Sequence, residues 1–202
     1  GTFDLSILNI VDGQYMEAGT GGDRWLGGDD IDRELQKLVY EKVTKKYNID
    51  NIEDLVAQLP DKKRFLFEGE MRLQTESAKI QLSSAQTADI FIDNILEDEN
   101  EEIIDVEVKI TKEEFETLAK PFVERSIELI DTLFKEVGYD ISMIDNILLV
   151  GGTSCIPLIK QMLSQKYGKD KIKISEKPML AVAEGAGILS HRLGDEYEPP
   201  FN

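Results

Sequence analysis

Residues 147–154 constrain the fold of this chain more than any other segment. The wholly apolar run 147–150 predicts a short strand that is buried on both faces. The sequence Gly-Gly-Thr-Ser follows it directly at 151–154, and a helical pattern opened by Pro157 comes next. A strand that leads through glycines into a helix is typical of α/β folds, so the predicted fold class is α/β.

The same turn is a candidate phosphate site. Gly151 and Gly152 would let a phosphate or a ribose approach the backbone, because no Cβ stands in the way. A helix N-terminus next to them would supply free N–H groups and a partial positive charge. We therefore take both glycines and Thr153 as candidate nucleotide-binding residues. An ordinary strand-to-helix turn has the same pattern, so this segment alone leaves both interpretations open.

The first residues of the chain form a second candidate site for phosphate or a cation. Apolar and polar residues alternate from Phe3 onward, which predicts a strand already under way at the first residues. Thr2 could place a hydroxyl beside a terminal phosphate, and Asp4 could hold a cation or orient a water. A capped strand edge is the alternative. We also expect the chain to be a piece of a longer protein, because it begins inside this strand.

A hairpin and a long helix should follow this strand. Asp12-Gly13 indicates a tight hairpin turn, and the glycines at 21–22 should break the return strand. Asp29 or Asp30 can then cap a helix that runs to about Tyr47. Gly28, just before it, lies either at a ligand or at a simple loop-to-helix junction.

The helix predicted from Asp61 to about Leu82 carries the third candidate. Glu76, Lys79 and Ser83 are spaced i, i+3, i+7 and therefore lie on one stripe. A carboxylate, an ammonium and a hydroxyl in this arrangement could bind a ribose and an adenine edge. An exposed ion pair on a solvated helix face is the competing interpretation.

Residues 86–110 predict an antiparallel hairpin. Isoleucine and valine alternate with charged residues from 104 to 110, and the acidic run 97–102 should form a solvated turn. Thr111 and Glu114 then match a capping box at the start of another helix.

Composition excludes several function classes. The formal net charge is −17, which argues against a nucleic-acid surface but not against ATP. The single cysteine, Cys155, cannot form a disulfide within the chain, which favours a reducing, cytoplasmic compartment. No run approaches the roughly 20 apolar residues that a membrane helix needs. The lone His191 has no partner at metal-ligand spacing, so no direct metal site is predicted.

Four motifs in order resemble the nucleotide-binding domain of the DnaK-type (heat-shock, seventy-kilodalton) chaperones. They are Gly-Thr-Phe-Asp at 1–4, Leu-Gly-Gly-Asp-Asp-Ile-Asp at 26–32, Glu-Ser-Ala-Lys-Ile-Gln-Leu-Ser-Ser at 76–84 and Leu-Val-Gly-Gly-Thr-Ser at 149–154. The resemblance implies lobe II of an actin-like (ribonuclease-H-like) domain, a mixed sheet flanked by helices with an inserted α+β subdomain. The base would comprise 1–26 and 111–194, the upper subdomain 27–110, and the tail or the start of a linker 195–202.

The resemblance also implies roles for the candidates. Thr2 would lie near the terminal phosphate and Asp4 near a bound cation. The ribose and adenine would face Gly28, Glu76, Lys79 and Ser83. The phosphates and adenosine would be held by Gly151, Gly152 and Thr153.

At the level of the whole protein, the resemblance implies ATP or ADP with magnesium as cofactors. The intact two-lobed domain would couple ATP binding and hydrolysis to the binding of unfolded polypeptide by a separate domain. Lobe I of the same protein, a nucleotide-exchange factor and a J-domain co-chaperone are the implied partners. The lobe I lysine and glutamate and the first phosphate loop are not in this sequence, so we name no catalytic residue and expect the lobe alone to be inactive.

The chain departs from the family pattern at the nucleoside. Cys155 stands where the family usually has an arginine, Met179 where it has an acid, and Trp25 at a usually small-polar or histidine position; Ile80 is shared with some bacterial members. These departures predict weaker contacts with adenosine. Two alternatives therefore stay open, a catalytically inactive interaction platform and another actin-superfamily ATPase, such as a sugar-kinase or filament relative. The Glu-Ser-Ala-Lys helix argues against the second.

Overall fold

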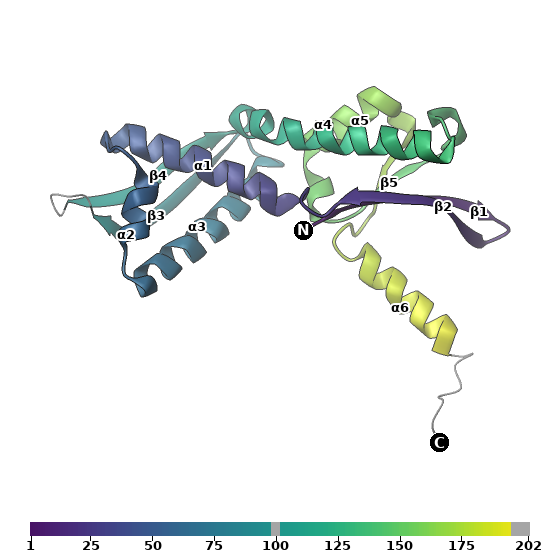
Figure 1. Ribbon diagram of the computed structural model, residues 1–202, viewed down its shortest axis with the longest axis horizontal. Helices are drawn as coiled ribbons and strands as arrows, with labels where there is room; N and C mark the ends of the chain where they lie inside the picture. Colours follow the sequence, from purple (N-terminus) through teal and green to yellow (C-terminus); the bar gives the residue numbers. More distant parts are fainter. Residues whose placement is uncertain (98–101, 195–202) are drawn as a thin grey trace, which may run out of the picture. The chain divides into compact units, whose positions relative to one another are not determined.

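The structure of the protein, a computed structural model, describes residues 1–97 and 102–194. The predicted tail 195–202 and positions 98–101 of the predicted acidic turn lie outside the described residues. The chain divides into two compact units, Gly1–Leu133 and Phe134–Asn202. Helices and strands alternate along it, as Figure 1 shows, in the order β1 (Phe3–Val11), β2 (Gln14–Asp23), α1 (Gly28–Tyr47), α2 (Ile52–Gln58), α3 (Asp61–Leu82), β3 (Thr87–Glu97), β4 (Ile103–Thr111), α4 (Lys112–Val137), β5 (Ile147–Leu149), α5 (Pro157–Tyr167), β6 (Ile172–Ile174) and α6 (Ala181–Gly194).

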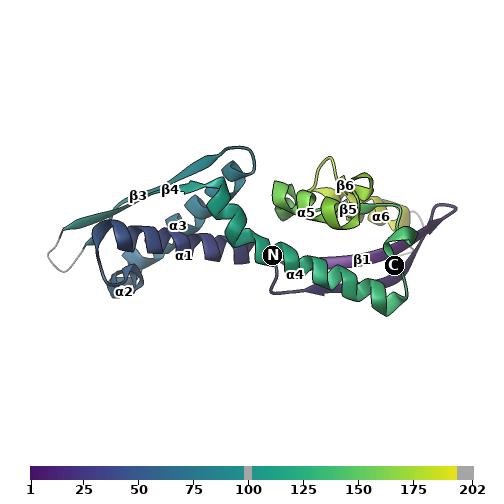
Figure 2. The same cartoon turned by 90° about the horizontal axis from the view of Figure 1, so that it is seen from above.

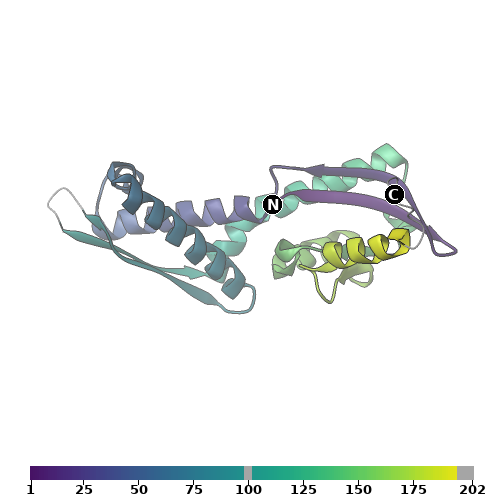
Figure 3. The ribbon, with the colours of Figure 1, turned by 90° about the horizontal axis from the view of Figure 1, so that it is seen from below.

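The core of the first unit lies between two helices and the β3–β4 hairpin. The alternation from 104 to 110 places Ile104, Val106, Val108 and Ile110 on one buried face, as the sequence predicts. Their antiparallel partners on β3 are equally buried, which doubles the apolar surface of that face. Helices α1 and α3 pack along the hairpin (Figures 1 and 3). They contribute fully buried side chains, among them Leu35, Val39, Val43, Phe67 and Met71.

The β1–β2 hairpin turns at Asp12 and Gly13 as predicted, but the expected break at 21–22 is wrong. Strand β2 continues to Asp23, and Gly22 lies opposite Asp4 in the register. The physical reason is a close approach, because a Cβ built on Gly22 would lie 2.3 Å from the carbonyl oxygen of Phe3. Glycine therefore continues this strand where a larger residue would collide with its neighbour.

The capping box at the start of α4 is confirmed. The N–H of Thr111 donates to Glu114 Oε2 over 2.9 Å, and the N–H of Glu114 donates to Thr111 Oγ1 over 3.2 Å. The second carboxylate oxygen of Glu114 lies 2.6 Å from Lys42 Nζ on α1. One side chain thus both caps α4 and pairs with α1.

We expect Thr111→Ala to lower the free energy of unfolding by about 1 kcal/mol, because the substitution leaves an N-terminal N–H of α4 without its acceptor. Urea unfolding followed by circular dichroism would measure the change. Thr117→Ala is the matched control, since Thr117 lies inside α4 and its hydroxyl only donates to the carbonyl of Glu113. Equal losses in both variants would contradict the capping role.

The second unit contains a strand-helix-strand segment. Strands β5 and β6 pair in parallel, with Ile147 opposite Ile172, and α5 connects them (Figure 2). The prediction that 147–150 is buried on both faces is wrong for the described structure, because the side chain of Leu148 is 62% exposed. Strand β5 has only β6 as a neighbour among the described strands, and its other two residues, Ile147 and Leu149, are half-buried.

The mixed α/β class is confirmed by this architecture. Among the described residues the strands form three two-stranded sheets, β1–β2, β3–β4 and β5–β6. The finer expectation, one ribonuclease-H-like mixed sheet flanked by helices, stays a proposal. The division into a base of 1–26 and 111–194 with an insertion at 27–110 likewise stays a prediction.

Candidate functional site

The first part of the candidate site lies where β1 begins. Thr2 Oγ1 donates a hydrogen bond to Asp4 Oδ2 over 2.6 Å, and both residues are exposed. The backbone of Gly1 lies against that of Gly27, where an added Cβ would be 2.5 Å from the Gly1 carbonyl oxygen. The start of β1 therefore lies beside the loop that leads into α1. The hydroxyl and carboxylate of Thr2 and Asp4 are oxygen ligands of the kind that hard cations prefer.

Helix α1 begins directly at this loop. The N–H of Gly27 donates to Asp30 Oδ2 over 2.7 Å, which caps the helix and places an acid near the positive end of its dipole. The carbonyl of Gly28 accepts a hydrogen bond from Lys79 Nζ over 3.5 Å. Two predicted site residues that are 51 positions apart in sequence therefore meet in the first unit.

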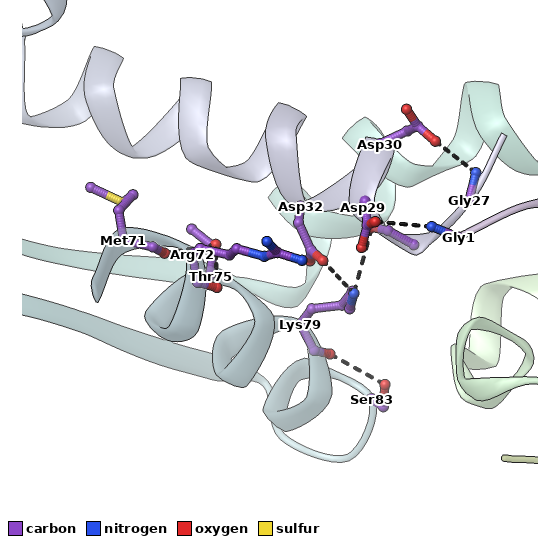
Figure 4. A network of polar contacts seen from close by, with 11 residues as sticks. Gly1, Gly27, Asp29, Asp30, Asp32, Met71, Arg72, Thr75, Lys79 and Ser83 are labelled. Carbon is purple, nitrogen blue, oxygen red and sulfur yellow. Dashed lines mark hydrogen bonds and ion pairs between the residues drawn. The ribbon is translucent and has the colours of Figure 1, made fainter. Parts of the chain in front are cut away.

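The main partner of Lys79 is Asp32, to which the sequence pattern assigned no role. The ammonium lies 2.6 Å from Asp32 Oδ2, and each side chain is only 13% exposed (Figure 4). The competing interpretation of an exposed ion pair is therefore wrong for Lys79, which joins α3 to α1 in a mostly buried pair. The available signal was the place of Asp32 beside the buried Ile31, at the edge of the apolar stripe of α1.

Asp32 is in an unusual electrostatic position. Burial raises the pKa of its carboxyl above the ordinary value, and the hydrogen bond and charge of Lys79 oppose this without cancelling it. Glu76 and Asp29 add to the rise. Its second oxygen, Oδ1, is buried and has no hydrogen-bond partner among the described residues. Such an oxygen is costly to bury, so the position needs a reason beyond packing.

The other two members of the α3 stripe differ from Lys79. Glu76 is exposed, and Ser83 is half-buried at the C-terminal cap of α3, where its hydroxyl donates to the carbonyl of Lys79 over 3.3 Å. The structure thus brings Ser83, Lys79 and Gly28 into one chain of contacts, and leaves the Glu76 carboxylate at the surface.

The glycine turn forms the candidate site of the second unit. Gly151 has a φ of +88°, in the left-handed region that favours glycine, and its N–H donates to the carbonyl of Pro178 over 2.7 Å. Ser154 is buried, and its hydroxyl donates to the Gly151 carbonyl over 2.6 Å. A short 3₁₀ turn occupies Gly152–Cys155, so α5 begins only at Pro157, after the predicted phosphate-facing residues rather than at them.

Two of the departures noted in the sequence lie at this turn. The side chain of Met179 reaches Gly152, where an added Cβ would be 3.7 Å from Met179 Cγ, yet the residue is 78% exposed overall. The bond from Gly151 to Pro178 holds these segments together. Cys155, at the end of the 3₁₀ turn, is exposed.

Within 1–97 and 102–194, no helix combines the length and apolar character that crossing a bilayer requires. The same residues contain no gathering of three or more His, Cys, Asp or Glu side chains suited to a metal ion.

Comparison with known proteins decides the family. The model of the Hsp70 protein family matches residues 1–198. The chain belongs to the Hsp70 family. It is 33% identical over 198 residues to the chaperone protein DnaK of Mycoplasmopsis agalactiae, which covers 98% of this chain. It is 35% identical over 199 residues to chaperone protein DnaK 3 of a Synechococcus strain, which covers 97%.

Membership of the Hsp70 family confirms the resemblance inferred from the four motifs and decides against a sugar-kinase or filament relative. The chain spans 31% and 29% of the lengths of these two relatives, about three tenths of each. Its fragment-like extent therefore agrees with the expectation from the sequence.

Proposed function

We propose that this chain is the second lobe of an Hsp70-type nucleotide-binding domain and binds ATP or ADP together with magnesium. The family match over residues 1–198 carries this proposal. Two local geometries support it. One is the left-handed glycine turn at Gly151, and the other is the contact between Gly28 and Lys79.

In the proposal, different candidate residues contact different parts of the nucleotide. In the proposal, Gly151, Gly152 and Thr153 hold the phosphates and adenosine, and Thr2 lies near the terminal phosphate. Backbone at a glycine can approach an anion closely, which suits the turn at 151–152. The ribose and adenine face a separate group of residues, namely Gly28, Glu76, Lys79 and Ser83.

Magnesium fits the residues that are present. The ion commonly keeps several waters and is bound through one or two carboxylates plus substrate phosphates, rather than in an all-protein cage. Asp4 offers one exposed carboxylate, with the Thr2 hydroxyl 2.6 Å from it. When bound, the ion would neutralise phosphate charge, which matters for a chain whose own net charge is −17. Asp4 would hold the ion or its water shell.

The proposal extends to the whole protein. Lobe I of the same protein would complete the nucleotide cleft, and closure of the lobes would bias a separate domain that binds unfolded polypeptide. The proposed partners of the whole protein are a nucleotide-exchange factor and a J-domain co-chaperone. Its proposed location is the cytoplasm. Positioning of phosphates, magnesium and water dominates phosphoryl transfer. We therefore expect the 202-residue chain alone to bind ATP weakly and to show no turnover above buffer.

A second candidate function is an interaction platform in a protein that has lost catalysis. The observation that favours it is Met179, an exposed apolar side chain that lies against Gly152 in the proposed nucleotide site. An intact first phosphate loop and lobe I lysine in the full-length protein would favour the ATPase, and their loss would favour the platform.

Gly152→Ala tests nucleotide binding without disturbing the fold. Its Cβ would meet only Met179, at ordinary contact distances of 3.7–3.9 Å, so the thermal midpoint should hardly change. The methyl group would nevertheless stand between the backbone and a phosphate. We expect the dissociation constant for MgADP, measured by calorimetry on the full-length protein, to rise at least about tenfold, which corresponds to about 1.4 kcal/mol.

Gly69→Ala serves as the control, since a Cβ there meets nothing within 4 Å and Gly69 lies on α3 away from the candidate residues. It should leave MgADP affinity unchanged. Absence of any MgATP or MgADP binding by the full-length protein at millimolar nucleotide would overturn the proposed function. Equal affinity in Gly152→Ala and wild type would remove this turn from the site.

A further inference from the structure

The pair formed by Asp32 and Lys79 is built differently from the surface ion pairs of this chain. Lys37 and Glu34 on α1 also lie 2.7 Å apart, but their side chains are 62% and 38% exposed. Asp32 and Lys79 are each 13% exposed and join α1 to α3 across 47 residues of sequence. A largely buried charge pair contributes little net stability compared with an apolar pair, so stability alone does not explain its presence.

The ammonium of Lys79 is held from one side only. Its described acceptors, Asp32 Oδ2 and the Gly28 carbonyl, both belong to α1. An ammonium has three N–H donors, so two can be directed toward α1 while one remains for another acceptor. Because Asp32 is mostly buried and lies on a helix, its contact fixes the position of the Lys79 ammonium, as Figure 4 shows.

From this geometry we infer that Asp32 is a positioning residue for the nucleotide site, which acts through Lys79 by holding its ammonium in place and charged. This inference rests on the proposed function, in which Lys79 faces the ribose and adenine. Asp32 itself does not contact the nucleotide. A preorganised donor loses less conformational freedom on binding, which is how a supporting carboxylate strengthens a contact that it does not make.

The charges around Asp32 come from both helices packed there. Asp29 lies on α1, Glu76 and Lys79 lie on α3, and Arg72 of α3 is drawn beside them in Figure 4. Burial, the largest cause, raises the pKa of Asp32; Lys79 opposes the rise, and the two acids add to it. Acidification therefore neutralises Asp32 earlier than an exposed aspartate, and the hold on Lys79 weakens with it.

Asp32→Asn in the full-length protein is the direct test. The amide keeps the shape of the carboxylate but removes its charge, so Lys79 should be held less firmly. We expect the dissociation constant for MgADP to rise about tenfold, the low end of the range for losing a supporting partner. Glu34→Gln is the matched control, because it removes an exposed ion pair from the same helix, and it should leave the affinity unchanged.

A double-mutant cycle separates positioning from a general structural effect. If Asp32 acts through Lys79, Asp32→Asn should weaken MgADP binding in the wild-type background but add nothing in a Lys79→Met background. Thermal unfolding of all four proteins would show that each is folded at the temperature of the binding measurement. Additive losses in the cycle would overturn the inference.

The pH profile provides a readout that loss of packing would not change. The ratio of the two dissociation constants, Asp32→Asn over wild type, should fall toward one as the pH is lowered through the folded-state pKa of Asp32, because protonated aspartate and asparagine are then equivalent. A ratio of about one at neutral pH, with MgADP still bound by wild type, would overturn this inference but leave the proposed function intact. Failure of wild type to bind MgADP at all would overturn the proposed function and this inference with it.

Discussion

Lys79→Met is expected to lower the free energy of unfolding by about 3 kcal/mol at neutral pH, the lower end of the range for breaking a buried ion pair. The substitution leaves the Asp32 carboxylate mostly buried and without its cation. Its other oxygen already has no partner among the described residues, so no existing contact can take the place of Lys79. Urea unfolding followed by far-ultraviolet circular dichroism would measure the loss.

The deficit of Lys79→Met should depend on pH in a defined direction. Burial already raises the pKa of Asp32, and loss of Lys79 removes the group that opposes this rise. A carboxyl whose folded-state pKa lies above its unfolded value contributes stability below the unfolded pKa, and this contribution is lost as the pH rises through the folded pKa. The difference from wild type should therefore be largest at neutral pH and shrink as the solution is acidified.

The double variant Asp32→Asn with Lys79→Met removes both charges and should recover most of the lost stability at neutral pH. This recovery would show that the unpaired carboxylate, rather than the lost packing of the lysine stem, causes the destabilisation. A double variant no more stable than Lys79→Met, or a deficit that grows on acidification, would contradict the interpretation.

Gly22→Ala should also cost about 3 kcal/mol of unfolding free energy, the upper end of the range for inserting a methyl group into well-packed structure. The new Cβ would lie 2.3 Å from the Phe3 carbonyl oxygen and 3.2 Å from the Cα of Asp4. Both are backbone atoms of the paired strand, so no flexible side chain can move aside. Relief requires β1 and β2 to separate, and the thermal midpoint should fall with the free energy.

Gly21→Ala, one residue away on the same strand, is the control for this prediction. Its Cβ would meet only Leu133 of α4, at 3.9 Å or more, which is ordinary contact. We expect the stability of this variant to be equal to or slightly above that of wild type, because alanine loses less backbone entropy on folding. Similar destabilisation in both variants would show that the general loss of glycine, and not the close approach at Gly22, is responsible.

Features that depend on neighbours in sequence were predictable. The alternation from 104 to 110 identified the buried face of β4, and the capping box of Thr111 and Glu114 located the start of α4. The order of four short motifs was sufficient for the family, which the match over 1–198 confirms. Periodicity, capping and backbone freedom act within a few residues, so a single sequence expresses them directly.

The parts of the candidate site that depend on docking were not predictable. The sequence stripe of Glu76, Lys79 and Ser83 left open whether its charges would be exposed, and it did not indicate that Lys79 would be paired with Asp32 on another helix. The end of β2 was also misjudged, because a glycine pair breaks a strand in isolation but permits close pairing against β1.

The sequence by itself therefore determined the α/β class, the family and the glycine turn at 151–154, which is part of the proposed nucleotide site. Only the tertiary structure decided that Lys79 is held by Asp32 and that Met179 is brought against Gly152 by the bond from Gly151 to Pro178. Asp32 and Lys79 are 47 positions apart in sequence, and Gly151 and Pro178 are 27 positions apart. Burial and the packing of separate elements select such partners, and no local pattern encodes which carboxylate or carbonyl will be within reach.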